Sequence, residues 1–221
     1  MNQSNFVIII PIKSLALAKS RLSNVLTKNE RFNITVNMFL EVIKASKKSL
    51  SNEVWVIGED KLFKDICSCF NVTWIQDEGC GLNNILNNKF SDAFKKNLTP
   101  IYIASDLPFI EFNDINMAIN LSNFGQDFVF SPAYNDKGTN LIIAPVLSDF
   151  LIKLGNYSLD KHTDQVVELN SKFSFCKQEG LVFDLDTVED LNYFQKIRPG
   201  IINKLMNKSD LISITMGMHY V

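Results

Sequence analysis

Three aspartates follow apolar runs of the sequence, where strands of a sheet would end. Asp106 comes after Ile101–Ala104, and Asp184 and Asp186 come after Leu181–Phe183. If a strand continues through the Asp184–Asp186 pair, both carboxylates point to one face. Like charges so close raise each other's pKa unless a cation lies between them, and oxygen ligands with few histidines favour Mg²⁺ or Mn²⁺. The sequence therefore predicts a divalent metal site at these three aspartates.

Two other interpretations of the second acidic pair are weaker. Asp186 or Thr187 would serve as the cap of a following helix, but this leaves Asp184 without a role. The segment Phe183–Val188 is also similar to the first motif of haloacid-dehalogenase-type phosphatases, in which the first aspartate is a nucleophile. That motif normally opens its domain, and too little chain follows Asp190 for the rest of such a fold. Metal coordination is the preferred interpretation.

Three cations follow the first apolar run, Phe6–Ile10, in the loop that contains Lys13, Lys19 and Arg21. Cations near the start of a helix oppose its dipole, so their placement there favours a bound anion such as a triphosphate. Ordinary solvated charges are the alternative, and the three residues alone favour it. The loop lacks the glycines and the GK[ST] of a P-loop and the spacing of a Rossmann fingerprint.

Strand-like and helix-like stretches alternate along the chain, which predicts a three-layer α/β domain with a mostly parallel sheet. In such sheets, ligands lie at the carboxyl ends of the strands. The remaining predicted strands are Val54–Ile57, Val72–Ile75, Phe128–Phe130 and Leu141–Ala144. The first predicted helix begins at Glu30. Further helices are predicted at Asp60–Phe70, Leu82–Lys96, Asp114–Asn123 and Leu147–Leu154, and two more begin near Leu159 and Thr187.

The composition fits one domain and a small-molecule partner. The chain has 221 residues and a net charge of -2, so no general field would attract nucleic acid or an anionic membrane. Its four cysteines form no CxxC pair, and the start shows no signal for export, so a cytoplasmic location is expected. Residues 1–198 are assigned to the single domain. Residues 199–221 form an extension without assignment, whose apolar residues could pack on a partner subunit in a homodimer: Ile201, Ile202, Leu205, Leu211, Ile212 and Ile214.

Taken together, these loops resemble the 2-phospho-L-lactate guanylyltransferase family, including its phosphoenolpyruvate-using members. These are nucleotidyltransferases with a fold like that of molybdenum-cofactor guanylyltransferase, Rossmann-like and GT-A-like. The match covers roughly Phe6 to Phe194. It rests on Pro11-Ile12-Lys13, Ala18-Lys19-Ser20-Arg21-Leu22, Gly81-Leu82-Asn83, Asp106-Leu107-Pro108, Gly138-Thr139-Asn140, the stretch from Gly155 through Ser158 to His162, and Asp184-Leu185-Asp186-Thr187 with Glu189-Asp190-Leu191. Each motif is weak alone, but their shared order is specific.

The resemblance implies a role for each motif. Two metals would bind the three aspartates, with Asp106, Lys19 and Arg21 acting in catalysis. The GTP-binding residues would be Lys13, Lys19, Arg21 and Asn83. The residues that contact the acceptor's phosphate and carboxylate would be Thr139, Asn140, Gly155 and Ser158. This sequence departs from the family's doubled Gly-Thr, because Asn135-Asp136-Lys137 precede a single Gly138-Thr139, and Lys137 could compensate or mark a different acceptor.

The implied reaction joins GMP from GTP to 2-phospho-L-lactate, phosphoenolpyruvate or 3-phosphoglycerate, with release of pyrophosphate, in coenzyme F-420 biosynthesis. A phosphate monoester is mostly dianionic at neutral pH, so the reaction needs no strong general base. His162 is accordingly interpreted as a structural or acceptor-side residue. The alternatives are a sugar-phosphate nucleotidyltransferase or a sugar-nucleotide-using glycosyltransferase, and, from another class, a non-catalytic nucleotide-binding regulator.

Overall fold

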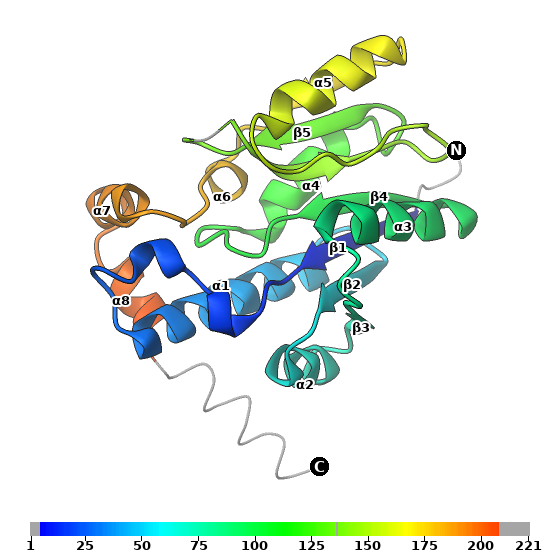
Figure 1. Ribbon diagram of the computed structural model, residues 1–221. Helices are drawn as coiled ribbons and strands as arrows, with labels where there is room; N and C mark the ends of the chain where they lie inside the picture. Colours follow the sequence, from blue (N-terminus) through cyan, green and yellow to red (C-terminus); the bar gives the residue numbers. More distant parts are fainter. Residues whose placement is uncertain (1–4, 136, 208–221) are drawn as a thin grey trace.

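A seven-stranded sheet forms the centre of the molecule (Figure 1). The structure is a computed structural model that describes residues 5–135 and 137–207. Its strand order is β3-β2-β1-β4-β6-β5-β7. In chain order the strands are β1 (Asn5–Pro11), β2 (Glu53–Gly58), β3 (Thr73–Gln76), β4 (Leu98–Ile103), β5 (Phe128–Pro132), β6 (Thr139–Ile143) and β7 (Phe173–Phe175).

The direction of β6 decides which residues share an edge of the sheet. β1 is parallel to β2 and β4, β3 to β2, and β7 to β5, whereas β6 is antiparallel to β4 and β5. Ile103, the last residue of β4, pairs with Leu141 of β6. The beginning of β6, at Thr139, therefore lies at the same edge as the carboxyl ends of β1 and β4. The predicted mostly parallel sheet is confirmed.

Helices cover both faces of this sheet, which confirms the three layers. Phe39 of α1 and Phe63 of α2 meet edge to face, and α1 also contacts α4, so these three helices share one face. Asn87 of α3 and Gln165 of α5 bind the same extended segment on the other face. The helices are α1 (Lys28–Lys48), α2 (Lys61–Cys69), α3 (Leu82–Lys95), α4 (Phe112–Leu121), α5 (Ser158–Glu168), α6 (Glu179–Val182), α7 (Val188–Ile197) and α8 (Ile201–Met206), and two short 3-10 turns lie at Leu15–Leu17 and Ser20–Leu22.

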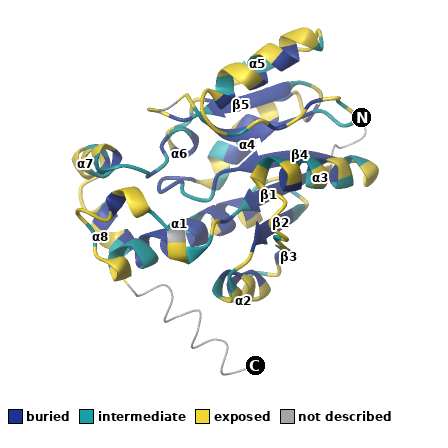
Figure 2. Ribbon diagram, viewed as in Figure 1, coloured by how far each residue is buried: buried dark blue, intermediate teal, exposed yellow. Residues whose placement is uncertain are grey.

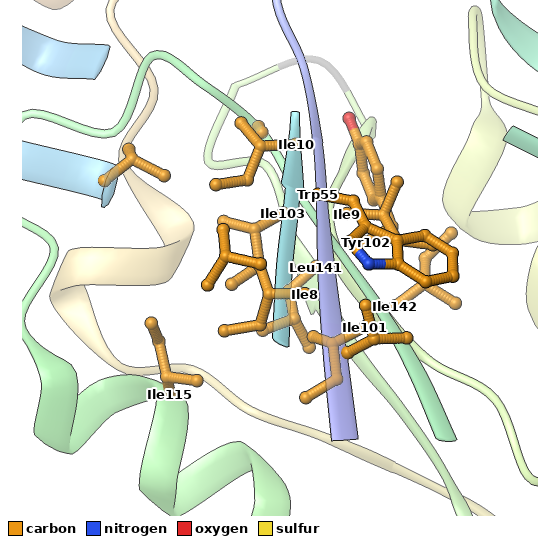
Figure 3. Packing of buried hydrophobic residues seen from close by; sticks show 14 of the residues in the cluster. Ile8, Ile9, Ile10, Trp55, Ile101, Tyr102, Ile103, Ile115, Leu141 and Ile142 are labelled. Atoms are coloured by element: carbon orange, nitrogen blue, oxygen red, sulfur yellow. The ribbon is translucent and has the colours of Figure 1, made fainter. Parts of the chain in front are cut away.

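The central strand β1 is buried on both sides. Ile8 and Ile10 lie on the side of Ile115 from α4, and Ile9 lies on the opposite side with Tyr102 of β4 (Figure 3). Figure 2 shows central strands such as β1 and β4 in the dark blue of buried residues and the outward faces of helices such as α5 in yellow. Each buried aliphatic side chain contributes about 1.5–3 kcal/mol through the hydrophobic effect. This burial explains why the continuous apolar run predicted the strand correctly.

The predicted helix Leu147–Leu154 is wrong, because Leu147 lies in a turn and residues 148–154 form neither a helix nor a strand of the sheet. Phe150 and Ile152 are buried while Leu151 is 53% exposed, and this alternation has the period of a strand rather than a helix. Side-chain amides take the place of a neighbouring strand. Asn87 binds both the N–H and the carbonyl of Ile152 at 2.7 and 3.2 Å, and Gln165 binds those of Leu151 at 2.7 and 2.9 Å.

The predicted strand Leu181–Phe183 is also wrong. Leu181 and Val182 form the second half of the short helix α6, which contacts β5, β6 and α4 from outside the sheet. β5 already pairs with β6 on one side and with β7 on the other, so it offers no free edge to residues 181–183. The short strand β7 was not predicted, because its three residues, Phe173–Phe175, carry too little periodic signal.

The part of the extension that the structure describes packs on its own chain. In Figure 1, α8 lies beside α1, and Ile202 and Leu205 of α8 are each 2% exposed. Asn37 of α1 donates to the carbonyls of Leu205 and Asn207 at 2.6 and 2.9 Å. These contacts contradict a partner-subunit role for Ile202 and Leu205. Three other residues of that prediction lie outside the described residues: Leu211, Ile212 and Ile214.

Candidate functional site

Lys19 joins two of the predicted aspartates at the edge of the sheet. Its ammonium lies 2.8 Å from Asp106 Oδ2 and 2.8 Å from Asp186 Oδ1. The Lys19 side chain is 7% exposed, against 28% for Asp106 and 41% for Asp186. Burial alone would lower the pKa of Lys19, but the two carboxylates outweigh this effect and raise it above 10.5. The site therefore holds a permanent positive charge between two carboxylates.

The backbone brings this lysine to the carboxylates from a loop after β1. Lys19 adopts a left-handed conformation, with φ 49° and ψ 42°, between the two 3-10 turns. Leu22 is fully buried at one end of the loop, and the Leu15 N–H donates to Asp60 Oδ2 at 2.7 Å at the other. Non-glycine residues seldom adopt this conformation, which is common at functional sites. The two anchors hold it in place.

Asp184 is bound by a different partner. Asn140 of β6 donates to Asp184 Oδ1 at 3.1 Å and to the Val182 carbonyl at 3.3 Å. The Leu185 N–H donates to the Asp106 carbonyl at 3.2 Å, so the two acidic loops are joined through the backbone as well. In the structure the Asn140 amide thus binds Asp184, and its contact with the acceptor stays a prediction.

Asp190 fixes the segment that carries Asp186, a role that was not predicted. It accepts hydrogen bonds from the N–H groups of Asp186 and Thr187 at 3.1 and 2.8 Å, and from Asn135 Nδ2 at 2.6 Å. Thr187 and Asp190 form the capping box of α7. Of the two residues considered as a helix cap, Thr187 is the cap, and Asp186 binds Lys19. The spacing Thr187-x-x-Asp190 was the available signal.

Lys13 and Arg21 are exposed and act on the site through their charge. Burial raises the pKa of Asp186, but Lys19 and then Lys13 and Arg21 outweigh it, so the pKa is below 3.8. Tyr102, buried beneath the site, has a pKa raised by burial and by the charges of the three aspartates. The predicted cations thus act on Asp186, and the three predicted carboxylates all act on Tyr102.

The donor atoms fit Mg²⁺ in kind, although the carboxylates do not form a ready-made cage. Within residues 5–135 and 137–207, no three acidic, histidine or cysteine side chains gather closely enough to hold a metal ion. Asp106 and Asp186 each place one carboxylate oxygen 2.8 Å from Lys19 Nζ, and carboxylate oxygens are hard ligands of the kind that Mg²⁺ prefers. Mg²⁺ usually binds one or two carboxylates and takes its other ligands from water and substrate phosphates. In the structure two of the three carboxylates bind Lys19 and the third binds Asn140, and metal binding by the three stays a prediction.

Asn83 makes a structural contact within the protein, and its contact with the nucleotide stays a prediction. Its side chain accepts from the Leu154 N–H at 2.8 Å and donates to the Leu154 carbonyl at 3.1 Å. It thereby continues the row of amides that holds the extended segment, next to Asn87. Asn83 fixes the backbone that leads to Gly155.

Thr139 and Ser158 come together as the resemblance implied. Their hydroxyl oxygens are 3.0 Å apart, and both side chains are buried. Gly155 has φ +119°, which disfavours side chains, and a Cβ built there would meet no atom within 4 Å. His162, buried on α5, lies 3.1 Å from Thr139 Oγ1. The structure therefore has an acidic, cation-containing half and a hydroxyl-containing half.

The chain matches the family model described as "Guanylyl transferase CofC like" over residues 6–195, most of its length. The chain belongs to this family. The expected family is thereby confirmed, and the protein is a nucleotidyltransferase. The match ends two residues before the end of α7, so it includes every predicted site residue.

Named relatives agree with the family. A "Phosphoenolpyruvate guanylyltransferase" of Thermobaculum terrenum is 22% identical over 98% of this chain and 100% of its own. A "2-phospho-L-lactate guanylyltransferase" of Methanocaldococcus infernus is 28% identical over 83% of this chain and 81% of its own. A putative nucleotide-diphospho-sugar transferase of Desulfovibrio desulfuricans superposes with a TM-score of 0.76 at 15% identity, covering 96% and 98% of the two chains. This last similarity supports the fold alone.

Burial of His162 should make stability depend on pH. Burial, aided by the charges of Lys153 and Lys161, lowers the pKa of His162 from 6.5 to about 4. Between these values the unfolded chain binds a proton that the folded chain does not, so acidification destabilises the fold by up to about 3 kcal/mol. Urea unfolding of wild type and His162→Asn between pH 7 and pH 4.5 measures this effect. Wild type should lose more stability than the variant, and parallel pH curves would contradict the prediction.

Proposed function

We propose that this protein transfers GMP from GTP to a small phosphorylated carboxylate and releases pyrophosphate. The acceptor would be phosphoenolpyruvate, 2-phospho-L-lactate or 3-phosphoglycerate. The names of the relatives support the first two acceptors. The observation that carries the proposal is Lys19 held between Asp106 and Asp186 at the edge where Thr139 also lies. One edge thus offers groups for a metal triphosphate and for a second anion.

In this reaction, a phosphate oxygen of the acceptor attacks the α-phosphorus of GTP in line. The bond between the α-phosphorus and the bridging oxygen breaks, and pyrophosphate leaves with that oxygen. The acceptor phosphate is already largely dianionic at neutral pH, so no side chain has to remove a proton. The main obstacle is the repulsion between two polyanions, and positive charge supplied by the protein reduces it.

The cations near the acidic residues would perform this task. Exposed Lys13 and Arg21 are suited to the outer phosphates, and Lys19 to the phosphorus under attack. Asp106 and Asp186 would hold Mg²⁺ or Mn²⁺, with Asp184 held ready by Asn140. The metal, when bound, would supply further charge neutralisation and alignment. Thr139, Gly155 and Ser158 would bind the acceptor's anionic groups.

A pyrophosphate-release assay tests the proposal. GTP, ATP and CTP are each combined with the three acceptors and Mg²⁺, and we expect release with GTP and at least one acceptor. Removal of the metal with EDTA should abolish the signal. Release only with a sugar phosphate would favour a sugar-phosphate nucleotidyltransferase. A nucleotide that is bound and never turned over would favour the regulator.

Three expectations from the sequence stay predictions. In the part of the chain that the structure describes, no helix is long and apolar enough to cross a bilayer. The cytoplasmic location and the role in coenzyme F-420 biosynthesis go beyond this finding. A homodimer likewise stays a prediction.

A further inference from the structure

Four groups form a continuous hydrogen-bonded series in the hydroxyl-containing half of the site. The Lys153 N–H donates to His162 Nε2 at 2.9 Å. His162 Nδ1 lies 3.1 Å from Thr139 Oγ1, which lies 3.0 Å from Ser158 Oγ. The three side chains are almost fully buried, with exposures of 0% for His162, 5% for Thr139 and 1% for Ser158. Buried polar groups of this kind need well-placed partners.

The first bond fixes the tautomer of the histidine. A ring nitrogen that accepts a hydrogen bond carries no proton, so the proton of neutral His162 is on Nδ1. The ring is held by Phe130, which stacks on it at 5.9 Å with an interplanar angle of 9°, and by Phe150 at 5.5 Å. Burial and nearby lysines keep its pKa at about 4, so His162 is neutral at neutral pH.

The tautomer then sets the direction of the hydroxyl hydrogens. Nδ1–H donates to Thr139 Oγ1, so the Thr139 hydrogen must turn away from the ring. A hydroxyl has one hydrogen and two acceptor lone pairs. The Thr139 hydrogen therefore points to Ser158 Oγ or to a bound ligand. If Ser158 receives it, the Ser158 hydrogen is available as the donor at the end of the series.

Thr139, one member of the series, lies at the edge of the sheet where β4 ends and the Asp106 loop begins. Thr139 is the first residue of β6, and the carbonyl of the next residue, Asn140, accepts from the Ala104 N–H at 2.8 Å, two residues before Asp106. Ser158 begins α5, and its N–H donates to the carbonyl of Gly155, next to which there is open space. A donor hydrogen at this place is suited to an anionic oxygen of a ligand in that space.

We propose that His162 is a positioning residue for the acceptor: it directs the hydroxyl hydrogens of Thr139 and Ser158 toward the acceptor's phosphate or carboxylate. The inference rests on the proposed function, because it takes the acceptor to be a phosphorylated carboxylate. It assigns to a buried histidine an effect on acceptor affinity without direct contact. His162 transfers no proton in this role.

Three variants separate this role from a purely structural one. His162→Phe keeps an aromatic ring between Phe130 and Phe150 but removes the donor to Thr139. His162→Asn keeps a donor near the position of Nδ1. Gln165→Met is the matched control, because Gln165 lies on the same helix and makes two hydrogen bonds to Leu151 of the same extended segment.

Calorimetry with phosphoenolpyruvate and steady-state kinetics with GTP provide the readouts. His162→Phe should raise the acceptor Kd and KM about tenfold, the size expected for one lost hydrogen bond to a charged group. The KM for GTP should not change. His162→Asn should restore acceptor binding to within about threefold of wild type, and Gln165→Met should lower Tm while keeping the acceptor KM within the same range. Equal acceptor KM in wild type and His162→Phe would overturn the inference.

A measurement on the unaltered protein covers the case in which His162→Phe does not fold. In ¹⁵N NMR spectra of the wild-type protein, with His162 assigned by its loss in His162→Asn, we expect the proton on Nδ1. A proton on Nε2 would overturn the inference. If wild type binds phosphoenolpyruvate but forms no product, the proposed transfer fails, while the binding data still decide the role of His162. A wild type that binds none of the three acceptors would overturn both.

Discussion

Replacing Asp106 with asparagine should lower kcat at least about a hundredfold, because even residues that only orient metal ligands affect activity by about 10- to 100-fold. The asparagine would have nearly the same shape and would keep one oxygen for Lys19, which lies 2.8 Å from Asp106 Oδ2. It would lack the negative charge that holds a divalent cation. The loss should therefore appear in turnover with Mg²⁺, measured as pyrophosphate release at saturating GTP and acceptor.

The fold should tolerate this change. The bond from the Leu185 N–H to the Asp106 carbonyl involves only backbone atoms, so the two acidic loops stay joined. Asp92→Asn is the matched control, since Asp92 is a carboxylate on α3 that also pairs with lysine, at 2.7 Å from Lys89. Asp92→Asn should keep normal turnover. If Asp106→Asn also keeps turnover within about threefold of wild type, Asp106 is not a metal ligand in catalysis.

The central part of the sheet could be predicted from the sequence because its strands are continuous apolar runs between turns. Phe6–Ile10 matches β1 closely, and Ile101–Ala104 overlaps the second half of β4, which begins at Leu98. The peripheral segments could not be predicted, since their structure depends on distant partners. Part of the predicted helix Leu147–Leu154 is instead held by side-chain amides of α3 and α5, which bind the backbone of Leu151, Ile152 and Leu154. No local pattern of residues 147–154 carries that information.

The same limit applies to the site. Asp106 could be predicted because it follows a strand at the carboxyl edge of the sheet, a rule that depends on topology alone. Asp184 could be predicted from its spacing to Asp186, although it follows a helix and not a strand. That Lys19 would lie between two carboxylates could not be predicted, because it depends on a left-handed backbone residue and on loops 87 and 167 residues away. Spacing predicts membership of a site more reliably than it predicts contacts.

Replacing Lys19 with methionine should have the second large effect, and it separates two roles of this lysine. The methionine would keep most of the length of the side chain and remove the charge, so Asp106 and Asp186 would face each other without a cation. Since these carboxylates are 28% and 41% exposed, the loss of unfolding free energy should be about 1–3 kcal/mol, between the values for exposed and buried pairs. Turnover with GTP should fall at least about tenfold, because a charge that acts on phosphate is lost.

The response of the Lys19→Met protein to metal is the decisive measurement. Without the ammonium, a divalent cation would meet two uncompensated carboxylates, so Mn²⁺ or Mg²⁺ should bind the variant more tightly than wild type in the absence of nucleotide. Tighter binding to the folded state raises Tm as the metal concentration rises. Thermal unfolding over a Mn²⁺ titration should thus show a larger rise in Tm for Lys19→Met than for wild type. Adding Asp186→Asn should abolish that difference, since it removes one of the two carboxylates. Equal Tm curves for wild type and Lys19→Met would mean that the lysine and the metal do not share these oxygens, and the metal would then have to be sought near Asp184.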